Sequence, residues 1–255
     1  MNSRERTVLI LSALLAGVLA LQPAAARAPE PGPAPDFGMT PAPAQLQRCL
    51  ARHAPAEIAP DLSELGKRTL SMVRKLVEAA DAVDRIYWSQ VWDRGLSTLA
   101  DIEQRNDPEA RDLATLMRIN YGPWNRMDED RPFLGRMDKP EGAAFYPADL
   151  SRVEFKQWLD EHPGDRTAFL SPYSVIRRTP QGLGALPYSQ AYESDIRAAA
   201  KALREAARLA DCRPLQRFLE SRAKALETDD YFQSEMLWMD VGNCPVDIAI
   251  GPYEF

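Results

Sequence analysis

The spacing of apolar residues predicts that most of the chain is helical. Over residues 61–101, leucine, valine and isoleucine recur at intervals of three and four, which is the period of a helix with one buried face. This stretch is expected to form one long helix or two stacked helices, with Ser63 as an N-cap. The same spacing predicts an antiparallel helix pair over 189–211 and 214–227, followed by a last helix over about 229–240.

Two local motifs mark further helix starts. Asp107 is followed by proline, which is well tolerated in a first turn because its missing N–H has no partner there. Ser151 and Glu154 have the spacing of a capping box. We therefore expect helices over about 108–119 and 152–162.

Strand patterns are few. Segments 171–178 and 183–188 flank a Pro-Gln-Gly turn and could form a hairpin. Val246, Ile248 and Ile250 form an alternating apolar face, which predicts a buried strand that ends at a Gly-Pro break. The predicted fold class is mainly α with a few short β-strands, an α+β arrangement. Because a buried strand needs partner strands, the end of the chain is expected to interrupt a sheet, so that the fold is truncated.

The first 26 residues have the pattern of a secretory signal peptide. Two arginines precede an apolar run over 8–21, and small residues after this run provide a cleavage site. The run is shorter than the about 20 residues that span a bilayer, and an uncleaved anchor is the alternative. Residues 27–45 are rich in proline and alanine and are predicted to be a linker before a mostly helical domain over 46–255. The protein is expected to be periplasmic or secreted, with no membrane association after cleavage.

Composition and charge narrow the classes of function. The chain is 45% hydrophobic and 27% charged, as in ordinary globular proteins, and its net charge is −6. With this acidic balance and no basic stripe in the sequence, a nucleic-acid partner is excluded. Cys49, Cys212 and Cys244 allow at most one disulfide in an oxidising compartment, and the sequence leaves the pairing open.

Each polar candidate for chemistry has a structural alternative. His53 and Cys49 have the spacing of a metal-binding pair on a helix, or are ordinary surface residues. His162 is expected to interact with a helix C-terminus. The acidic run 128–130 could bind a cation or form a solvated loop, and 229–230 are expected to cap the last helix. The sequence predicts no catalytic residue, no metal ligand set and no cofactor in this chain.

Two loops carry more aromatic residues than plain connectors need. Tyr121 and Trp124 lie in the loop 120–126, and Tyr146 lies in the loop 142–147. Long loops with such side chains either cover a core or line a binding cleft, and both interpretations stay open.

Several segments in order resemble the amino-terminal half of bacterial proteins related to the dipeptidyl peptidase III family. The resemblance covers about residue 61 to the end of the chain. The segments are Asn-Tyr-Gly-Pro-Trp at 120–124, Phe-Tyr-Pro at 145–147, Ser-Pro-Tyr-Ser-Val-Ile-Arg-Arg at 171–178, Pro-Tyr-Ser-x-Ala-Tyr at 187–192, Asp-Asp-Tyr-Phe at 229–232 and Val-Asp-Ile-Ala-Ile-Gly-Pro-Tyr-Glu at 246–254.

This resemblance implies the helical lobe of a two-lobed zinc metallopeptidase that binds a peptide substrate in a wide cleft. In the family, a helical His-Glu-x-x-(x)-His motif and a downstream Glu hold zinc, which activates water. The family motif lies beyond the position that matches Phe255, and the only histidines here, His53 and His162, do not form it. The resemblance therefore implies an amino-terminal portion that is inactive alone, with a missing carboxy-terminal half as a possible partner.

The resemblance also suggests substrate-binding residues. Tyr253 and Glu254 follow the Gly-Pro break and resemble the family segment that borders the cleft, where a carboxylate can meet the amino terminus of a peptide. The alternative is that they are ordinary residues at a strand end. The aromatic residues Tyr121, Trp124 and Tyr146 complete the set of candidates for substrate binding.

Three hypotheses for function follow. The first is the amino-terminal part of a periplasmic dipeptidyl-peptidase-III-like enzyme. The second is a non-catalytic periplasmic protein that binds peptides or another partner on the same scaffold. The third is a helical scaffold in which the aromatic segments serve only packing.

Overall fold

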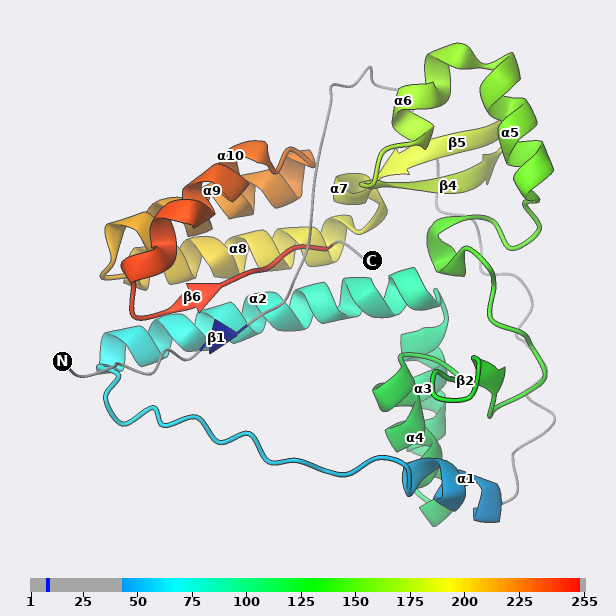
Figure 1. The fold of residues 1–255 in the computed structure, drawn as a ribbon, viewed down its shortest axis with the longest axis horizontal. Coiled ribbons are helices and arrows are strands. Elements are labelled where there is room, and N and C mark those ends of the chain that lie inside the picture. The colour runs from blue at the N-terminus through cyan, green and yellow to red at the C-terminus, as the bar shows by residue number, and fades with distance from the viewer. Residues whose placement is uncertain (1–7, 10–42, 253–255) are drawn as a thin grey trace.

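The computed structural model describes residues 8–9 and 43–252, and this part of the chain is mainly helical (Figure 1). Its α-helices are α1 (Pro43–Leu50), α2 (Lys67–Val91), α3 (Gly95–Gln104), α4 (Pro108–Asn120), α5 (Arg152–Glu161), α6 (Arg166–Phe169), α7 (Tyr188–Ala191), α8 (Glu193–Leu209), α9 (Arg213–Thr228) and α10 (Phe232–Trp238). The strands are β1 (Val8–Leu9), β2 (Trp124–Asn125), β3 (Arg131–Pro132), β4 (Ser174–Thr179), β5 (Gly182–Pro187) and β6 (Asp247–Ile248). Short 3₁₀ helices are η1 (Ala143–Phe145), η2 (Pro163–Asp165) and η3 (Met239–Asn243). The predicted fold class, mainly α with a few short strands, is confirmed.

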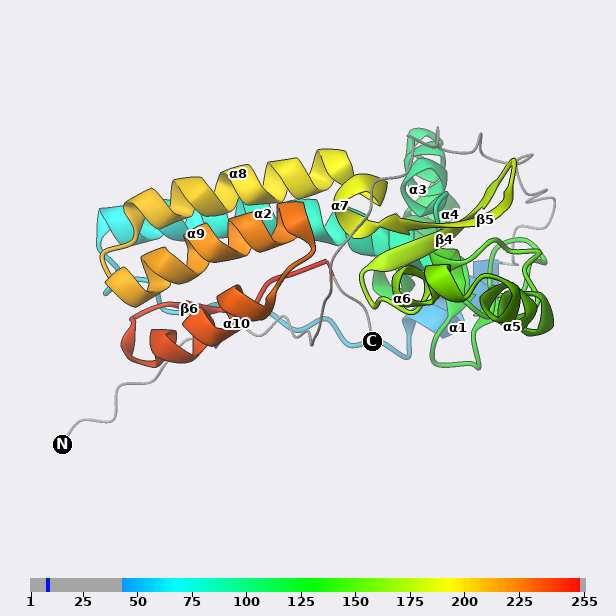
Figure 2. The ribbon, with the colours of Figure 1, turned by 90° about the horizontal axis from the view of Figure 1, so that it is seen from above.

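Helices α2, α8 and α9 lie side by side and enclose the largest core (Figures 1 and 2). The predicted antiparallel pair is confirmed as α8 and α9. The stretch 61–101 forms two helices, α2 and α3, and α2 begins after Gly66. The expectation that Ser63 is the N-cap was wrong, because α2 begins only after Gly66. Ser63 lies in a turn before the helix, where its backbone N–H donates to Asp61 Oδ1 at 2.9 Å.

The other two helix starts follow the local motifs. The Asp107 side chain accepts a hydrogen bond from the N–H of Ala110 at 2.8 Å and caps α4. The Ser151 hydroxyl oxygen accepts a hydrogen bond from the N–H of Glu154 at 3.1 Å and caps α5. Both caps satisfy N–H groups that have no partner within the helix, so these starts are encoded locally.

Two smaller cores lie beside the main one. The first is formed by α1, α3 and α4 and centres on the buried rings of Trp88, Trp92 and Trp124. The second lies between α5, α6 and the β4–β5 hairpin and includes Phe169 and Ile176. Figure 1 shows these two groups on the same side of the molecule, below and above the end of α2.

The predicted hairpin and the terminal strand are both present. Strands β4 and β5 pair antiparallel, with Thr179 opposite Gly182 at the turn. Val246, Ile248 and Ile250 are buried, as the alternating pattern predicts. Sheet pairing of this segment is limited to β6, which lies parallel to β1. Apart from β1 and the start of α1, the predicted leader and linker lie outside the described residues.

A disulfide joins Cys212, at the start of α9, to Cys244, at the end of η3, across 32 residues of sequence. Cys49 is free and half-buried. Within the described ranges, no helix has both the length and the apolar character needed to cross a membrane. The disulfide fixes the position from which the terminal strand segment starts.

Loss of the Cys212–Cys244 bond should lower the free energy of unfolding by about 3 to 4 kcal/mol, because a cross-link over a loop of this length restricts the unfolded chain. Urea unfolding of the native chain and of the Cys212→Ala, Cys244→Ala double variant would measure it. Cys49→Ala is the matched control and should leave the midpoint nearly unchanged. Equal midpoints for all three proteins would contradict the expectation.

Candidate functional site

The C-terminal half of α2 supports two of the segments that carry candidate residues. The Gln90 side chain donates a hydrogen bond from Nε2 to the carbonyl oxygen of Pro252 at 2.6 Å. The Tyr121 hydroxyl donates to Asp84 Oδ1 at 2.7 Å. At 3.6 residues per turn, positions 84 and 90 lie roughly 120° apart around the helix, so the two contacts are on neighbouring sides of α2. Tyr253 and Glu254 lie outside the described residues, directly after Pro252.

Tyr121 is held firmly at the end of α4. It caps this helix in the left-handed conformation, with φ 58°. Its ring meets the ring of Tyr87 edge-on, with 4.5 Å between centroids, and lies 5.0 Å from the ring of Trp88. Burial, together with the hydrogen bond to Asp84, raises the pKa of the Tyr121 hydroxyl, which therefore stays a proton donor at neutral pH.

The other two aromatic candidates lie in different surroundings. Trp124 is 2% exposed, donates from Nε1 to the carbonyl of Met137 at 2.7 Å and packs edge-on against Trp92. Tyr146 is 40% exposed and meets the ring of Phe155 edge-on at 5.6 Å. Trp124 thus belongs to the core around α4, whereas Tyr146 lies beside α5. The structure does not bring the two together.

Four of the segments that carry the resemblance meet in one aromatic cluster. The rings of Tyr173 and Tyr231 are 4.8 Å apart, and Tyr173 lies 6.3 Å from Tyr188. Phe145 stacks on Tyr188 at 6.3 Å, and Tyr192 meets Tyr188 at 5.4 Å. The cluster joins the β4–β5 hairpin and η1 to the main helices, so these segments share a structural role.

Asp229 does not cap the last helix, and that expectation was wrong. It ends α9 in the left-handed conformation, with φ 56°, and its carboxylate accepts hydrogen bonds from the N–H and the hydroxyl of Ser189 at 3.1 and 2.5 Å. Ser189 lies in the first turn of α7, where free N–H groups favour a carboxylate. Helix α10 has Tyr231 as its N-cap. The Asp229 carboxylate therefore binds Ser189, which is distant in sequence, and does not cap the helix that follows directly after it.

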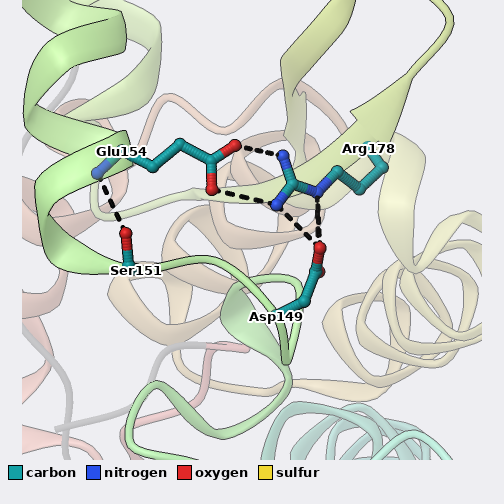
Figure 3. Close-up of polar contacts among 4 residues, drawn as sticks. All are labelled: Asp149, Ser151, Glu154 and Arg178. Carbon is teal, nitrogen blue, oxygen red and sulfur yellow. Dashed lines mark hydrogen bonds and ion pairs between the residues drawn. The ribbon is translucent and has the colours of Figure 1, made fainter.

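Arg178 joins β4 to the loop before α5 (Figure 3). Its Nη2 lies 2.8 Å from Asp149 Oδ2 and 3.0 Å from Glu154 Oε2. Hydrogen bonds from the guanidinium lower the pKa of both carboxyl groups. Glu154 thus makes two contacts. Its carboxylate accepts hydrogen bonds from Arg178, and its backbone N–H donates to the hydroxyl of Ser151. All three charged side chains are exposed or nearly so, and their arrangement fixes the hairpin against α5.

The potential metal ligands of the described chain are dispersed. His53 Nδ1 lies 3.1 Å from the backbone oxygen of Cys49, and His162 stacks on the ring of Trp158 at 3.9 Å. No group of three or more His, Cys, Asp or Glu side chains that could hold a metal ion is found among residues 8–9 and 43–252. In the acidic run 128–130, Asp130 pairs with Lys139 at 3.1 Å. Each of these candidate side chains is therefore engaged by a residue nearby in the sequence.

Two buried polar residues near the terminal segment escaped the sequence-based predictions. Gln90 is 1% exposed and Arg222 is 2% exposed. Each occupies a position where the apolar spacing of its helix calls for a core residue, with Val83 and Ile86 preceding Gln90 on the same face. A polar side chain that interrupts an apolar stripe was the available signal. Its partner, a backbone carbonyl far away in sequence, could not be identified from that signal.

Comparison with solved structures identifies the fold. Dipeptidyl peptidase III from Caldithrix abyssi is 38% identical, with a TM-score of 0.75 over 77% of this chain and 38% of that chain. Dipeptidyl peptidase III from Corallococcus sp. strain EGB is 34% identical, with a TM-score of 0.72 over 76% of this chain and 37% of that chain. The resemblance inferred from sequence is confirmed at the level of the fold, which is that of a dipeptidyl-peptidase-III-like helical lobe.

Among curated proteins, Nudix hydrolase 3 of Arabidopsis thaliana is 27% identical over 264 residues, which cover 82% of this chain and 34% of that protein. No protein-family model matches the chain. The chain spans little more than a third of the length of each of these three relatives. The likeness therefore establishes a shared scaffold, and the activity of the whole relatives is a separate question.

Asp229→Asn should change the pH dependence of stability. Burial raises the pKa of Asp229, and this effect is larger than that of the hydrogen bonds from Ser189, which lower the pKa. A carboxyl group with a raised pKa in the fold contributes stability below its unfolded pKa of about 3.9 and loses it as pH rises through the folded pKa. As the pH rises over that range, the native chain should therefore lose stability relative to Asp229→Asn. The measured quantity is the difference between their free energies of unfolding.

Urea unfolding at several pH values from about 4 to 7 would measure this difference. Asparagine suits the left-handed conformation and keeps an acceptor for Ser189, so the variant should fold. Asp230→Asn removes the same charge from an exposed neighbour and is the control. A difference that does not change with pH, or one that rises with pH, would contradict the assignment.

Proposed function

We propose that this chain is the amino-terminal part of a secreted or periplasmic zinc metallopeptidase of the dipeptidyl peptidase III kind. In this proposal it provides the helical side of a cleft that binds peptides, and it does not hydrolyse them by itself. The zinc ligands would be supplied by a carboxy-terminal part. The proposed location rests on the signal-peptide pattern of the first 26 residues.

The fold match is the observation that carries the proposal. Two dipeptidyl peptidase III structures from different bacteria agree with this chain over about three quarters of its length at 34 and 38% identity. The sequence segments that resemble this family also build the aromatic cluster. These segments lie at 145–147, 171–178, 187–192 and 229–232. The match supports a common scaffold for peptide hydrolysis.

The described side chains do not fit a catalytic zinc ion. Such a site needs three protein ligands that converge on one point and leave a position open for water. His53 and His162 lie on separate elements, after α1 and after α5, and each is engaged by its own helix. We therefore derive no catalytic step for this chain. Its proposed contribution is to bind and orient a peptide.

Tyr253 and Glu254 are the proposed contacts to the substrate. They follow Pro252, whose carbonyl is fixed by Gln90 on α2. A carboxylate at this position would pair with the charged amino terminus of a peptide, and tyrosine would offer a ring and a hydroxyl. Tyr146 is exposed enough to take part. Tyr121 and Trp124 would act through the support that they give to α2 and α4.

Binding of a short peptide to the purified chain tests this role. We expect a tetra-alanine peptide with a free amino terminus to bind more tightly than its acetylated form, because only the first can pair with Glu254. Glu254→Gln should weaken binding of the free peptide by roughly tenfold or more, the loss expected for a charge-assisted hydrogen bond, and leave the acetylated peptide unaffected. Isothermal titration calorimetry provides the measurement, and Glu129→Gln, on an exposed loop, is the control.

Transplantation tests the assignment to the peptidase. Residues 46–255 would replace the matching part of the Caldithrix abyssi enzyme. We expect the chimera to release dipeptides until zinc is chelated, and the chain alone to release none. A folded chimera without activity would contradict the proposal, as would stoichiometric zinc in the chain alone. Saturable peptide binding together with an inactive, folded chimera would favour a non-catalytic binding protein.

A further inference from the structure

Helix α10 is anchored to the rest of the described chain by one face. On this face Ser234 is fully buried, and Glu235 accepts a hydrogen bond from Arg222 of α9 at 2.5 Å. At the end of the helix, Trp238 donates from Nε1 to Asp247 Oδ1 at 3.0 Å, which ties α10 to β6. Among the described elements, α10 packs against α9 and the following η3. Figure 2 shows α10 at the outer edge of the row formed by α8, α9 and α10.

The other face of α10 carries a stripe of exposed apolar side chains. Positions 232, 236 and 239 have the i, i+4, i+7 spacing that places side chains on one face, and α10 continues directly into η3. A helix that is apolar on all sides is normally buried on all sides, and clustered exposed apolar groups mark surfaces for interaction. We call this surface the α10 stripe; its members are Phe232 (68% exposed), Met236 (54%), Trp238 (37%) and Met239 (72%).

Acidic side chains border the α10 stripe. Asp230 precedes it and Asp240 follows it, both exposed, and Asp247 accepts the hydrogen bond from its indole. From 225 to 252 the sequence contains no lysine, arginine or histidine. The exposed bases of the neighbouring α9, Arg217 and Lys224, lie on the side of that helix opposite its buried residues. Charge complementarity therefore favours a cover that has an apolar centre and basic flanks.

The same charge pattern disfavours two other covers. In a symmetric dimer the α10 stripe would face its own copy, which would bring the two acidic borders together. An anionic membrane surface would also meet like charge. A helix with apolar residues along one face and lysine or arginine beside them fits both the stripe and its border, and methionine side chains adapt to the shape of such a partner.

We propose that the α10 stripe is the docking surface for a basic amphipathic helix, and that the carboxy-terminal part of the proposed peptidase supplies this helix. The source of the helix rests on the proposed function, whereas the stripe and its acidic border stand independently of it. The two dipeptidyl peptidase III structures match this chain over only 38 and 37% of their own length. More than half of such a protein is therefore available to cover the stripe.

Methionine oxidation tests the surface on the purified chain. Hydrogen peroxide oxidises exposed methionines, so Met236 and Met239 should react at rates similar to that of Met127, which is 49% exposed in another part of the fold. A synthetic amphipathic helix of leucine and lysine is the probe. At about ten times its Kd it should slow oxidation of Met236 and Met239 roughly tenfold, because only the free chain reacts, and leave Met127 unchanged. Mass spectrometry gives the rate for each methionine.

A charge within the α10 stripe should prevent docking. Met236→Lys should weaken binding of the probe by roughly tenfold or more, because the new charge would be buried against apolar side chains and repelled by the lysines. Val153→Lys adds the same charge at a position on α5 that is 77% exposed, and it is the matched control. The probe with glutamate in place of lysine should not protect the two methionines.

Several results would overturn the inference. They are no binding of the probe, binding that leaves Met236 and Met239 reactive, and equal binding by Met236→Lys and Val153→Lys. Protection of the two methionines by anionic vesicles, or by raising the concentration of the chain alone, would assign the stripe to a membrane or to a second copy instead.

The chimera with the Caldithrix abyssi enzyme tests the source of the helix. Met236→Lys should lower the urea midpoint of the chimera and leave that of the chain alone unchanged, because the stripe would be covered only in the chimera. Equal effects on both proteins, or a chimera that does not fold, would contradict the carboxy-terminal part as the source. A folded chimera that is destabilised by Met236→Lys but releases no dipeptides would contradict the proposed function alone.

Discussion

Close packing of α2, α8 and α9 through alanine side chains is the constraint on which the rest of the structure depends. Small side chains let helix backbones approach closely, and larger residues then fill the remaining space to the density of a protein interior. The buried alanines of α2 and α8 are Ala79, Ala82, Ala199, Ala200, Ala202, Ala206 and Ala207. Because α2 is fixed along its length by this packing, its C-terminal half becomes a rigid support for everything attached beyond residue 84.

The buried polar groups connect the segments that are attached to these helices. Arg222 reaches Ile250 and Glu235, and it also faces the ring of Tyr231, which in turn packs against Tyr173 in the aromatic cluster. The terminal segment and the β4–β5 hairpin are thus connected through one tyrosine. Hydrogen-bonded polar groups in a core specify one arrangement more strictly than apolar contacts alone, because any other arrangement leaves them unpaired. The apolar packing supplies stability, and the polar contacts select the path of the chain.

The parts of the fold that could be predicted are those encoded by neighbours in sequence. The caps at Asp107 and Ser151, the hairpin and the helix pair each depend on residues a few positions apart or on a regular apolar period. Ser63 does not cap α2 because the helix begins only after Gly66. Asp229 found a partner 40 residues away at Ser189. A pairing over this distance depends on tertiary contacts that no local pattern contains.

In the candidate site, too, the sequence indicated unusual residues but not their distant partners. Tyr121 and Trp124 were recognised as unusual from composition, but their partners, Asp84 on α2 and the carbonyl of Met137, were not. Gln90 and Arg222 interrupt the apolar stripes of their helices, and this was the available signal. The identity of a polar residue on an apolar stripe indicates that a buried acceptor exists, and only the fold identifies that acceptor.

The likeness to dipeptidyl peptidase III concerns geometry more than chemistry. A fold can carry different activities, because activity depends on the few groups that meet at the reacting atoms. In the described chain the two imidazoles are held by local contacts with Cys49 and Trp158, so the helices do not bring metal ligands together. What the helices do bring together is the support for Pro252. A peptidase of this kind would need such support wherever its substrate is bound, since misplacement of a bound group by about 1 Å can reduce a rate by orders of magnitude. In the proposed function, the lobe would contribute to hydrolysis by fixing positions, and the segments that resemble the family would provide the packing that makes those positions rigid.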